Sequence, residues 1–342
     1  MTTMRRVVVH PGRIAVESAE VPAPGPGEVL IRTLVAGVCG SDLHAAHGRH
    51  PFVALPYLPG HEVVGIIETA GSAVQAWKPG QRVTLEPDLP CWTCKMCTSG
   101  RENLCENLQF FGCGYPQGGM ADYFTIRADR LHAVPDLLAD HAAALIEPLS
   151  TPVHAVRLAG EVAGRAVAVL GGGTIGLLTL AVLRAHGAGK VVTTDPNPAK
   201  RARAAALGAD ATIDAGTPDV AGQVRQVLGG SADIVFDCVA IQSSVEQAIA
   251  MADKGGTVVV VGVPAREVMV PLPIVQDHQI RIQGSATYLP EDFSESVDLL
   301  RRGAIRAPDF VTATRPLPQV AEAFELAASG NHVKVLVTVD HR

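Results

Sequence analysis

The sequence of 342 residues has no block of basic residues. Its net charge is −6, and lysine and arginine occur in nothing longer than pairs such as Arg5-Arg6 and Arg301-Arg302. A nucleic-acid interface needs positive charge gathered on one face, and attraction to an anionic membrane needs a basic cluster. We therefore expect no nucleic-acid partner and no membrane partner.

Long apolar runs are missing as well. Residues 166–183 carry no charge, but Gly171-Gly172-Gly173 and Gly176 interrupt this stretch near its middle. A buried strand, a tight turn and a buried helix explain it better than a membrane span. The N-terminal run Val7-Val8-Val9 is too short for an export signal. We expect a cytoplasmic protein whose cysteines stay reduced.

The sequence shows no internal repeat, and its length suggests roughly two domains at about 150 residues each. Up to about residue 150 it is β-rich, with strand-like runs at 29–35 and 63–68 between Pro/Gly turns. This pattern predicts an antiparallel, partly barrel-like body whose loops carry function.

From about residue 150 β-branched runs alternate with Ala-rich helical stretches, which predicts a parallel sheet buried on both faces. The expected strands are 167–170, 190–194, 233–237, 257–261 and 280–284, and the expected helices are 174–186 and 199–207. After residue 285 we expect helices at 293–301 and 320–328 and a terminal strand at 334–339. This tail is expected to return to the first domain.

The run Gly171-Gly172-Gly173-Thr174-Ile175-Gly176 fits GxGxxG, and it follows a strand and opens a helix. Gly171 permits the tight turn. Gly173 lets the backbone approach a pyrophosphate at the helix N-terminus, and Gly176 lets the helix and strand pack closely. The competing interpretation is a purely structural glycine turn.

Asp195 ends the next expected strand, about twenty residues after this turn. A carboxylate there binds the adenine-side ribose and repels a 2′-phosphate, which favours NAD over NADP. Lys200 and Arg201 weaken that preference, because a cation could help bind either cofactor. Asp195 could instead be a simple helix cap.

Four cysteines lie in one short loop with CxxCxxC spacing, namely Cys91, Cys94, Cys97 and Cys105. Disulfides are disfavoured in a reducing compartment. Four thiols without a histidine are typical of a closed tetrahedral zinc that shapes a loop. We predict a structural zinc with no vacant coordination position.

A second, mixed set of metal ligands lies upstream. Cys39 is followed by His61 and Glu62, and a Cys/His/carboxylate set is typical of an open zinc with room for substrate. By chemistry alone, Cys39 could be a buried apolar residue and His61 a turn histidine. Glu147 lies in an apolar stretch, where a charge needs a partner.

These motifs resemble those of the zinc-dependent medium-chain dehydrogenase/reductase family. The resemblance covers essentially the whole length and includes Gly118-Gly119-Met120-Ala121 and Glu147-Pro148-Leu149. It implies an α/β fold with a GroES-like β-rich catalytic domain, residues 1–150 and 285–342, and a Rossmann doubly wound parallel-sheet domain, residues 151–284. It also implies two zinc ions per chain and NAD.

By this resemblance, Cys39, His61 and Glu62 hold the catalytic zinc. Glu147 matches the position that binds that zinc, directly or through its water, in the polyol and butanediol dehydrogenase branch. Ser41 and His44 match the relay that passes the alcohol proton to solvent.

One departure concerns the substrate. Sugar-polyol members of the family often carry an arginine before the tyrosine in the segment that here reads Ser285-Ala286-Thr287-Tyr288. Thr287 favours a shorter diol or secondary alcohol. The expected reaction is hydride transfer from a secondary alcohol, diol or polyol to NAD, with threonine as an alternative substrate. A homo-oligomer is expected, with a tetramer favoured over a dimer.

Two other functions compete with this one. A nucleotide-binding sensor or structural protein would lack a catalytic ligand, whereas all are in place here. A zinc-free quinone reductase would lack both metal sets, so the zinc content separates it from the enzyme that we expect.

Overall fold

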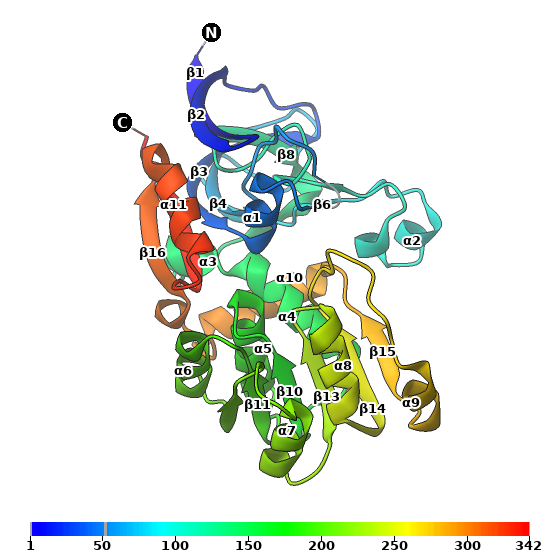
Figure 1. The fold of residues 1–342 in the computed structure, drawn as a ribbon. Coiled ribbons are helices and arrows are strands. Elements are labelled where there is room, and N and C mark those ends of the chain that lie inside the picture. The colour runs from blue at the N-terminus through cyan, green and yellow to red at the C-terminus, as the bar shows by residue number, and fades with distance from the viewer. Residues whose placement is uncertain (1, 51–52, 342) are drawn as a thin grey trace. The chain divides into compact units, whose positions relative to one another are not determined.

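The computed structural model describes residues 2–50 and 53–341 (Figure 1). The chain divides into two compact units. Unit 1 contains Met1–Pro148 and Leu289–Arg342, and unit 2 contains Leu149–Tyr288. In the described part of the chain no helix has the length and apolar character needed to cross a membrane.

Unit 1 is built on a seven-stranded sheet in the order β16-β17-β3-β4-β5-β9, with β8 also paired to β3. The strands are β3 (Glu28–Val38), β4 (Glu62–Ala70), β5 (Arg82–Leu85), β8 (Tyr123–Arg127), β9 (Leu131–Ala133), β16 (Val311–Pro316) and β17 (Lys334–Thr338). The C-terminal strand β17 runs antiparallel to β3, with Val335 opposite Val38. The tail therefore completes a sheet that the first part of the chain begins.

Alternate residues of these strands point into one core. Val29, Ile31, Phe124 and Val335 are at most 1% exposed and belong to the same apolar cluster. The side-chain period of two along a strand explains this pattern. The helices of this unit include α1 (Gly40–Ala46), α3 (Asp140–Ala143), α10 (Pro290–Arg301) and α11 (Val320–Ala328).

Two features of unit 1 lie outside the main sheet. An N-terminal hairpin joins β1 (Thr3–His10) to β2 (Arg13–Glu20). The four-cysteine loop carries α2 (Lys95–Thr98) and lies between β6 (Asp88–Leu89) and β7 (Gln109–Phe110), which pair with each other. The hairpin was not predicted from the sequence.

Unit 2 contains a six-stranded, fully parallel sheet in the order β12-β11-β10-β13-β14-β15. The strands are β10 (Val167–Leu170), β11 (Val191–Thr194), β12 (Ala211–Ile213), β13 (Ala232–Asp237), β14 (Ala252–Val260) and β15 (Arg281–Gly284). The parallel sheet predicted from the alternating pattern is confirmed. Its strand order reverses between β10 and β13, which is where open α/β sheets bind ligands.

Helices cover both faces of this sheet. They are α5 (Thr174–Ala185), α6 (Pro198–Ala206), α7 (Val220–Leu228), α8 (Gln242–Met251) and α9 (Leu272–Asp277), with α4 (Ile146–Ala159) entering the unit. Ala168 and Leu170 of β10 share an apolar cluster with α7 and α8. Val169 faces the other way, toward the start of α5. The α/β fold class is therefore confirmed.

Candidate functional site

The end of β3 and the start of β4 bring three ligand-type side chains together. The two strands are antiparallel and place Gly37 opposite Glu62, so Cys39 and His61 emerge at the same end of the pair. The ligand atoms of Cys39, His61 and Glu62 all lie within 4.8 Å of one another. His61 is 3% exposed and Glu62 is fully buried. The structure thus assembles the mixed set that was read from the sequence.

Glycines make this close packing possible. Gly60 has φ +107°, and a Cβ on it would lie 2.3 Å from the backbone nitrogen of Met120. A Cβ on Gly37 would lie 1.8 Å from Oε2 of Glu62. Any side chain at these two positions would displace either the backbone before His61 or the Glu62 carboxylate.

A buried lysine balances the charge of Glu62. Nζ of Lys334 lies 2.5 Å and 2.7 Å from the two Glu62 oxygens and donates to the Val38 carbonyl at 3.1 Å. Lys334 begins β17 and is 2% exposed. Burial lowers its pKa, but the charges of Glu62 and Cys39 raise it by more, so the lysine is positively charged. Glu62 therefore forms an ion pair as well as facing Cys39 and His61.

Sequence reasoning missed Lys334. A signal was present, because Lys334 is the single charge in the run 333–339, and a buried charge needs a partner. The partner itself lies 272 positions away. Only the pairing of β17 with β3 and of β3 with β4 brings the two side chains together.

The charges around His61 favour a cation. Burial by itself would lower the pKa of His61, but the charge of Cys39 and its hydrogen bond to the imidazole, followed by the charges of Asp42 and Glu147, raise that pKa well above its ordinary value. A positive ion among these groups would offset the same negative charges. The soft thiolate and imidazole donors suit zinc.

Glu147 lies in the first turn of α4 and is 6% exposed. Among the described residues, Glu147 is not part of the group of three whose ligand atoms all lie within 4.8 Å of one another. Its charge nevertheless raises the pKa of both His61 and Lys334, so it lies close to them. This position is compatible with binding a metal directly or through water.

Ser41 and His44 both belong to α1, which begins directly after Cys39. The amide of Cys39 donates to Oδ2 of Asp42 at 2.9 Å, which caps the helix. Residues three apart share a helix face, so Ser41 and His44 lie on the same face of α1. Ser41 is half-buried and His44 is exposed.

The four cysteines of the second set also converge. Their ligand atoms lie within 4.8 Å of one another, with the Cys94 sulfur 3.5 Å from Cys97 and 3.9 Å from Cys105. Sulfurs around a tetrahedral zinc, with bonds of about 2.3 Å, lie about 3.8 Å apart. The backbone amide of Cys91 donates to the Cys105 sulfur at 3.3 Å. The residues therefore fit a structural zinc.

Trp92 ties this loop to the body of unit 1. It has φ 60°, and its indole donates to Oδ2 of Asp129 at 3.0 Å. The guanidinium groups of Arg127 and Arg130 lie 5.8 Å and 5.3 Å from its ring centroid. Trp92 is 42% exposed, so these contacts rather than burial hold its ring in place.

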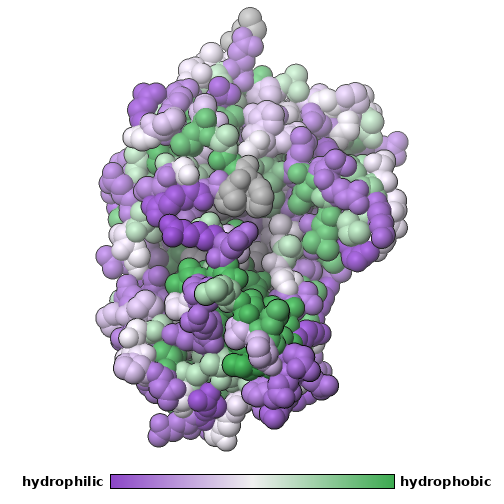
Figure 2. Space-filling model, turned by 45° about the vertical axis from the view of Figure 1, so that its right-hand side comes forward, coloured by the Kyte–Doolittle hydropathy of each residue, from purple (hydrophilic) through white to green (hydrophobic). Residues whose placement is uncertain are grey.

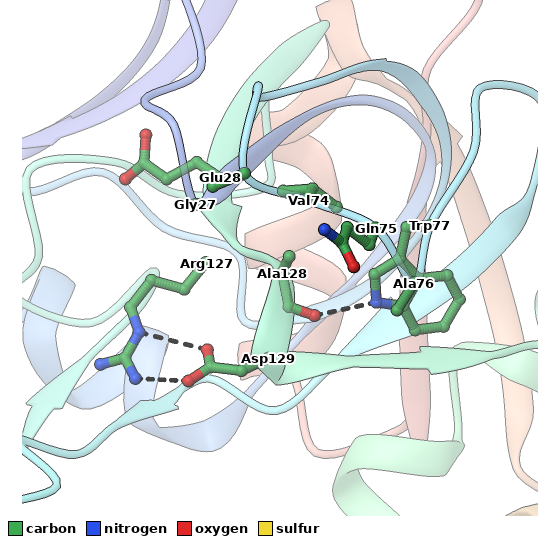
Figure 3. A pocket seen from close by; sticks show the side chains of 10 residues that line it. Gly27, Glu28, Val74, Gln75, Ala76, Trp77, Arg127, Ala128 and Asp129 are labelled. Atoms are coloured by element: carbon green, nitrogen blue, oxygen red, sulfur yellow. Dashed lines mark hydrogen bonds and ion pairs between the residues drawn. The ribbon is translucent and has the colours of Figure 1, made fainter.

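A surface pocket of about 490 Å³ adjoins Asp129 but contains none of the predicted site residues. Figure 3 shows two interactions among the residues that line it. The indole of Trp77 donates to the Ala128 carbonyl at 2.9 Å, and Arg127 is paired with Asp129. We therefore assign the pocket no role in the chemistry.

In unit 2 the glycine-rich turn joins β10 to α5. Gly171 has φ +97°, which favours glycine. A Cβ on Gly176 would lie 1.7 Å from the Gly171 carbonyl oxygen, whereas nothing lies within 4 Å of a Cβ on Gly173. The first and third glycines thus serve the turn itself. Gly173 leaves open space before Thr174 and Ile175, the first residues of α5.

Asp195 follows β11 and packs against this turn. Its Oδ2 accepts from the Gly172 amide at 2.8 Å, and its Oδ1 accepts from the Asn197 amide at 2.8 Å. Nζ of Lys200 lies 4.0 Å from Oδ2. Asp195 is 6% exposed, so its carboxylate is fixed in place beside the open space at Gly173.

Comparisons with known proteins agree with this geometry. Residues 25–136 match the alcohol dehydrogenase GroES-like domain, and residues 174–302 match the zinc-binding dehydrogenase family. Mouse sorbitol dehydrogenase is 35% identical over 98% of this chain and 95% of its own length.

Two solved structures are also similar. A Sinorhizobium meliloti structure bound to NADP is 34% identical, with a TM-score of 0.92 over 99% of this chain and 100% of that one. The 2R,3R-butanediol dehydrogenase of Bacillus subtilis is 29% identical, with a TM-score of 0.91 over 98% and 100%.

Proposed function

The chain belongs to the zinc-dependent medium-chain dehydrogenase family, and we propose that it oxidises a short diol or another secondary alcohol with NAD. The observation that carries this proposal is the buried cluster of Cys39, His61 and Glu62. The reaction converts the alcohol and NAD to a ketone or aldehyde, NADH and a proton. The protein is thus an oxidoreductase that acts on small alcohols or polyols.

Cys39 and His61 would hold the catalytic zinc, with Glu62 or Glu147 completing the site. When bound, the ion acts as a Lewis acid that lowers the pKa of the substrate hydroxyl. The ion pair with Lys334 engages both oxygens of Glu62. This arrangement favours Glu147 as the carboxylate that approaches the ion, directly or through water.

Ser41 and His44 would move the proton. The half-buried hydroxyl of Ser41 accepts it from the substrate, and the exposed imidazole of His44 passes it to solvent. An imidazole can accept a proton at one nitrogen and release one from the other, as a relay requires. Their common face on α1 supports this order of transfer.

NAD would bind at the glycine-rich turn of unit 2, with the pyrophosphate at Gly173, Thr174 and Ile175 and the adenine-side ribose at Asp195. Bound, it accepts the hydride. The buried carboxylate of Asp195 disfavours a 2′-phosphate. Lys200 offers a compensating charge, and one relative binds NADP. Initial rates with NAD and NADP at equal concentrations test this preference.

The substrate class is tested by NADH formation from four compounds at matched concentration. These are butane-2,3-diol, sorbitol, a simple secondary alcohol and threonine. Because Thr287 stands where sugar-polyol enzymes often have arginine, we expect the diol to be turned over faster than sorbitol. Preference for sorbitol would contradict the assignment of a short substrate. Turnover of none, with NAD bound, would favour a non-catalytic binding protein.

A homo-oligomer, with a tetramer favoured over a dimer, and a cytoplasmic location complete the proposal. Figure 2 shows a patch of apolar side chains on the face in view. The exposed large apolar side chains of unit 2 include Val263, Met269, Leu272 and Ile274, which are close in sequence to the edge strand β15. Large exposed apolar patches mark interaction sites. Sedimentation of the zinc-replete protein measures the assembly.

A further inference from the structure

The ring of His61 lacks the support that usually orients a metal-binding histidine. Such a residue normally donates its second ring nitrogen to a carboxylate, a carbonyl or water. Nδ1 of His61 is buried and has no hydrogen-bond partner among the described residues. A contact other than a hydrogen bond to Nδ1 must therefore help to orient the ring.

Asp42 is the carboxylate that could have taken this role. Its charge acts on His61. However, its Oδ2 accepts from the Cys39 amide at 2.9 Å, and its Oδ1 accepts from the Tyr57 hydroxyl at 3.0 Å. Asp42 thus caps α1 and binds Tyr57, and it makes no hydrogen bond to Nδ1 of His61.

The aromatic ring of Phe110 meets His61 instead. The two ring centroids are 5.5 Å apart and the ring planes cross at 73°, an edge-to-face contact. Two residues later, Gly112 lies against the His61 backbone. A Cβ on Gly112 would lie 2.3 Å from the Gly60 carbonyl oxygen and 2.9 Å from the His61 nitrogen. The segment 110–112 therefore contacts both the ring and the main chain of His61.

The four-cysteine loop leads directly into this segment. Cys105 stands only five positions before Phe110. The amide of Asn107 donates to the Cys105 sulfur at 3.3 Å, and the amide of Leu108 donates to its carbonyl at 3.2 Å. On the other side, Phe111 donates its amide to the Pro87 carbonyl at 2.8 Å.

We propose that Phe110 is a positioning residue that holds the His61 imidazole in its metal-binding orientation, and that the four-cysteine loop holds Phe110 through Cys105. The loop metal thereby supports the metal site at Cys39 and His61, beyond its role in shaping its own loop. This inference rests on the proposed metal-binding role of His61.

The test compares Phe110→Leu with Phe111→Leu in the full-length protein loaded with cobalt. Phe111 is the matched control, because its fully buried ring packs on Phe124 at 4.9 Å rather than on His61. Cobalt bound by one thiolate and cobalt bound by four absorb differently, so a chelator's removal of each ion can be followed separately without substrate.

We expect Phe110→Leu to release cobalt from the Cys39/His61 site about tenfold faster and to alter its absorption band. Phe111→Leu should lower thermal stability while leaving that band and release rate unchanged. Cys94→Ser, which removes a loop ligand far from Phe110, should also speed release from the Cys39/His61 site.

An unchanged band and release rate in Phe110→Leu would overturn the inference. A change in KM alone would also overturn it, because Phe110 would then contact substrate instead. Normal release from the Cys39/His61 site in Cys94→Ser would overturn the coupling to the loop. Wild-type protein that holds cobalt only at the four cysteines would contradict the proposed function itself.

Discussion

The Glu62 carboxylate is fully buried, and its negative charge is stabilised by a second buried charge. Removing a charge from water costs several kcal/mol unless a partner and further hydrogen bonds compensate. Lys334 supplies that partner and also donates to the Val38 carbonyl. Gly37 leaves the space that the carboxylate fills. Lys334, the first residue of β17, thus offsets the negative charge of Glu62 next to the candidate metal site.

Replacing Lys334 with methionine should lower the free energy of unfolding by about 3–5 kcal/mol, because Glu62 would be left as an unpaired buried charge. Urea denaturation of the metal-free protein measures the loss. The double variant Glu62→Gln/Lys334→Met has no charge at either position and should recover most of the stability. A double variant as unstable as Lys334→Met would show that packing rather than charge is responsible.

Replacing Ser41 with alanine should lower kcat on the order of 100-fold, because the substrate proton loses its first acceptor. The affinity for NAD, measured by fluorescence titration, should stay unchanged, since Ser41 belongs to unit 1 and the glycine-rich turn to unit 2. An unchanged kcat would remove Ser41 from the relay.

At the scale of an element, different glycines of the turn between β10 and α5 serve folding and cofactor binding. A Cβ on Gly176 would overlap the Gly171 carbonyl, whereas a Cβ on Gly173 meets open space. Gly176→Ala should therefore lower the free energy of unfolding by about 1–3 kcal/mol. Gly173→Ala should leave it nearly unchanged but weaken NADH binding, because the methyl group would occupy the space proposed for the pyrophosphate.

Urea denaturation and NADH fluorescence titration measure the two effects. Equal stability of the two variants would contradict the steric argument. Tight NADH binding by Gly173→Ala would contradict the placement of the pyrophosphate.

Several elements of unit 2 were predictable because they depend on a local pattern, whereas β12, α7, α8 and α9 were not predicted. The strand at 167–170 and the helix from Thr174 appear at the predicted positions. The ion pair of Lys334 with Glu62 and the contact of Phe110 with His61 were not predictable. Both depend on which strands and loops become neighbours, and local periodicity carries no information about that.

The β1–β2 hairpin was not predicted because the sequence of its strands carries only a weak strand pattern. Its strands run from Thr3 to His10 and from Arg13 to Glu20, but only Val7, Val8 and Val9 are deeply buried. The second strand has no fully buried residue and therefore no clear alternation of apolar and polar side chains. Its pairing with β1, rather than its composition, defines it as a strand.

At the scale of the whole molecule, each unit has its own apolar core. One cluster joins the sheet of unit 1 to α11, and another joins the sheet of unit 2 to α7 and α8. The candidate metal ligands all lie in unit 1, and the glycine-rich turn and Asp195 lie in unit 2. A ligand that binds only the folded state stabilises the segments that contact it.

Hydrogen exchange should therefore respond to zinc removal and to NADH in different segments. Chelation should speed exchange in residues 91–105 and around His61, because the thiols and the imidazole lose their common ion. NADH at about 100 times its Kd should slow exchange in residues 171–176 and 195–200. The expected increase in local stability is at most about 2.7 kcal/mol. Mass spectrometry of peptides measures both effects. An exchange rate in residues 171–176 that does not change with NADH would contradict the proposed cofactor site. An exchange rate in residues 91–105 that does not change on chelation would contradict the structural zinc.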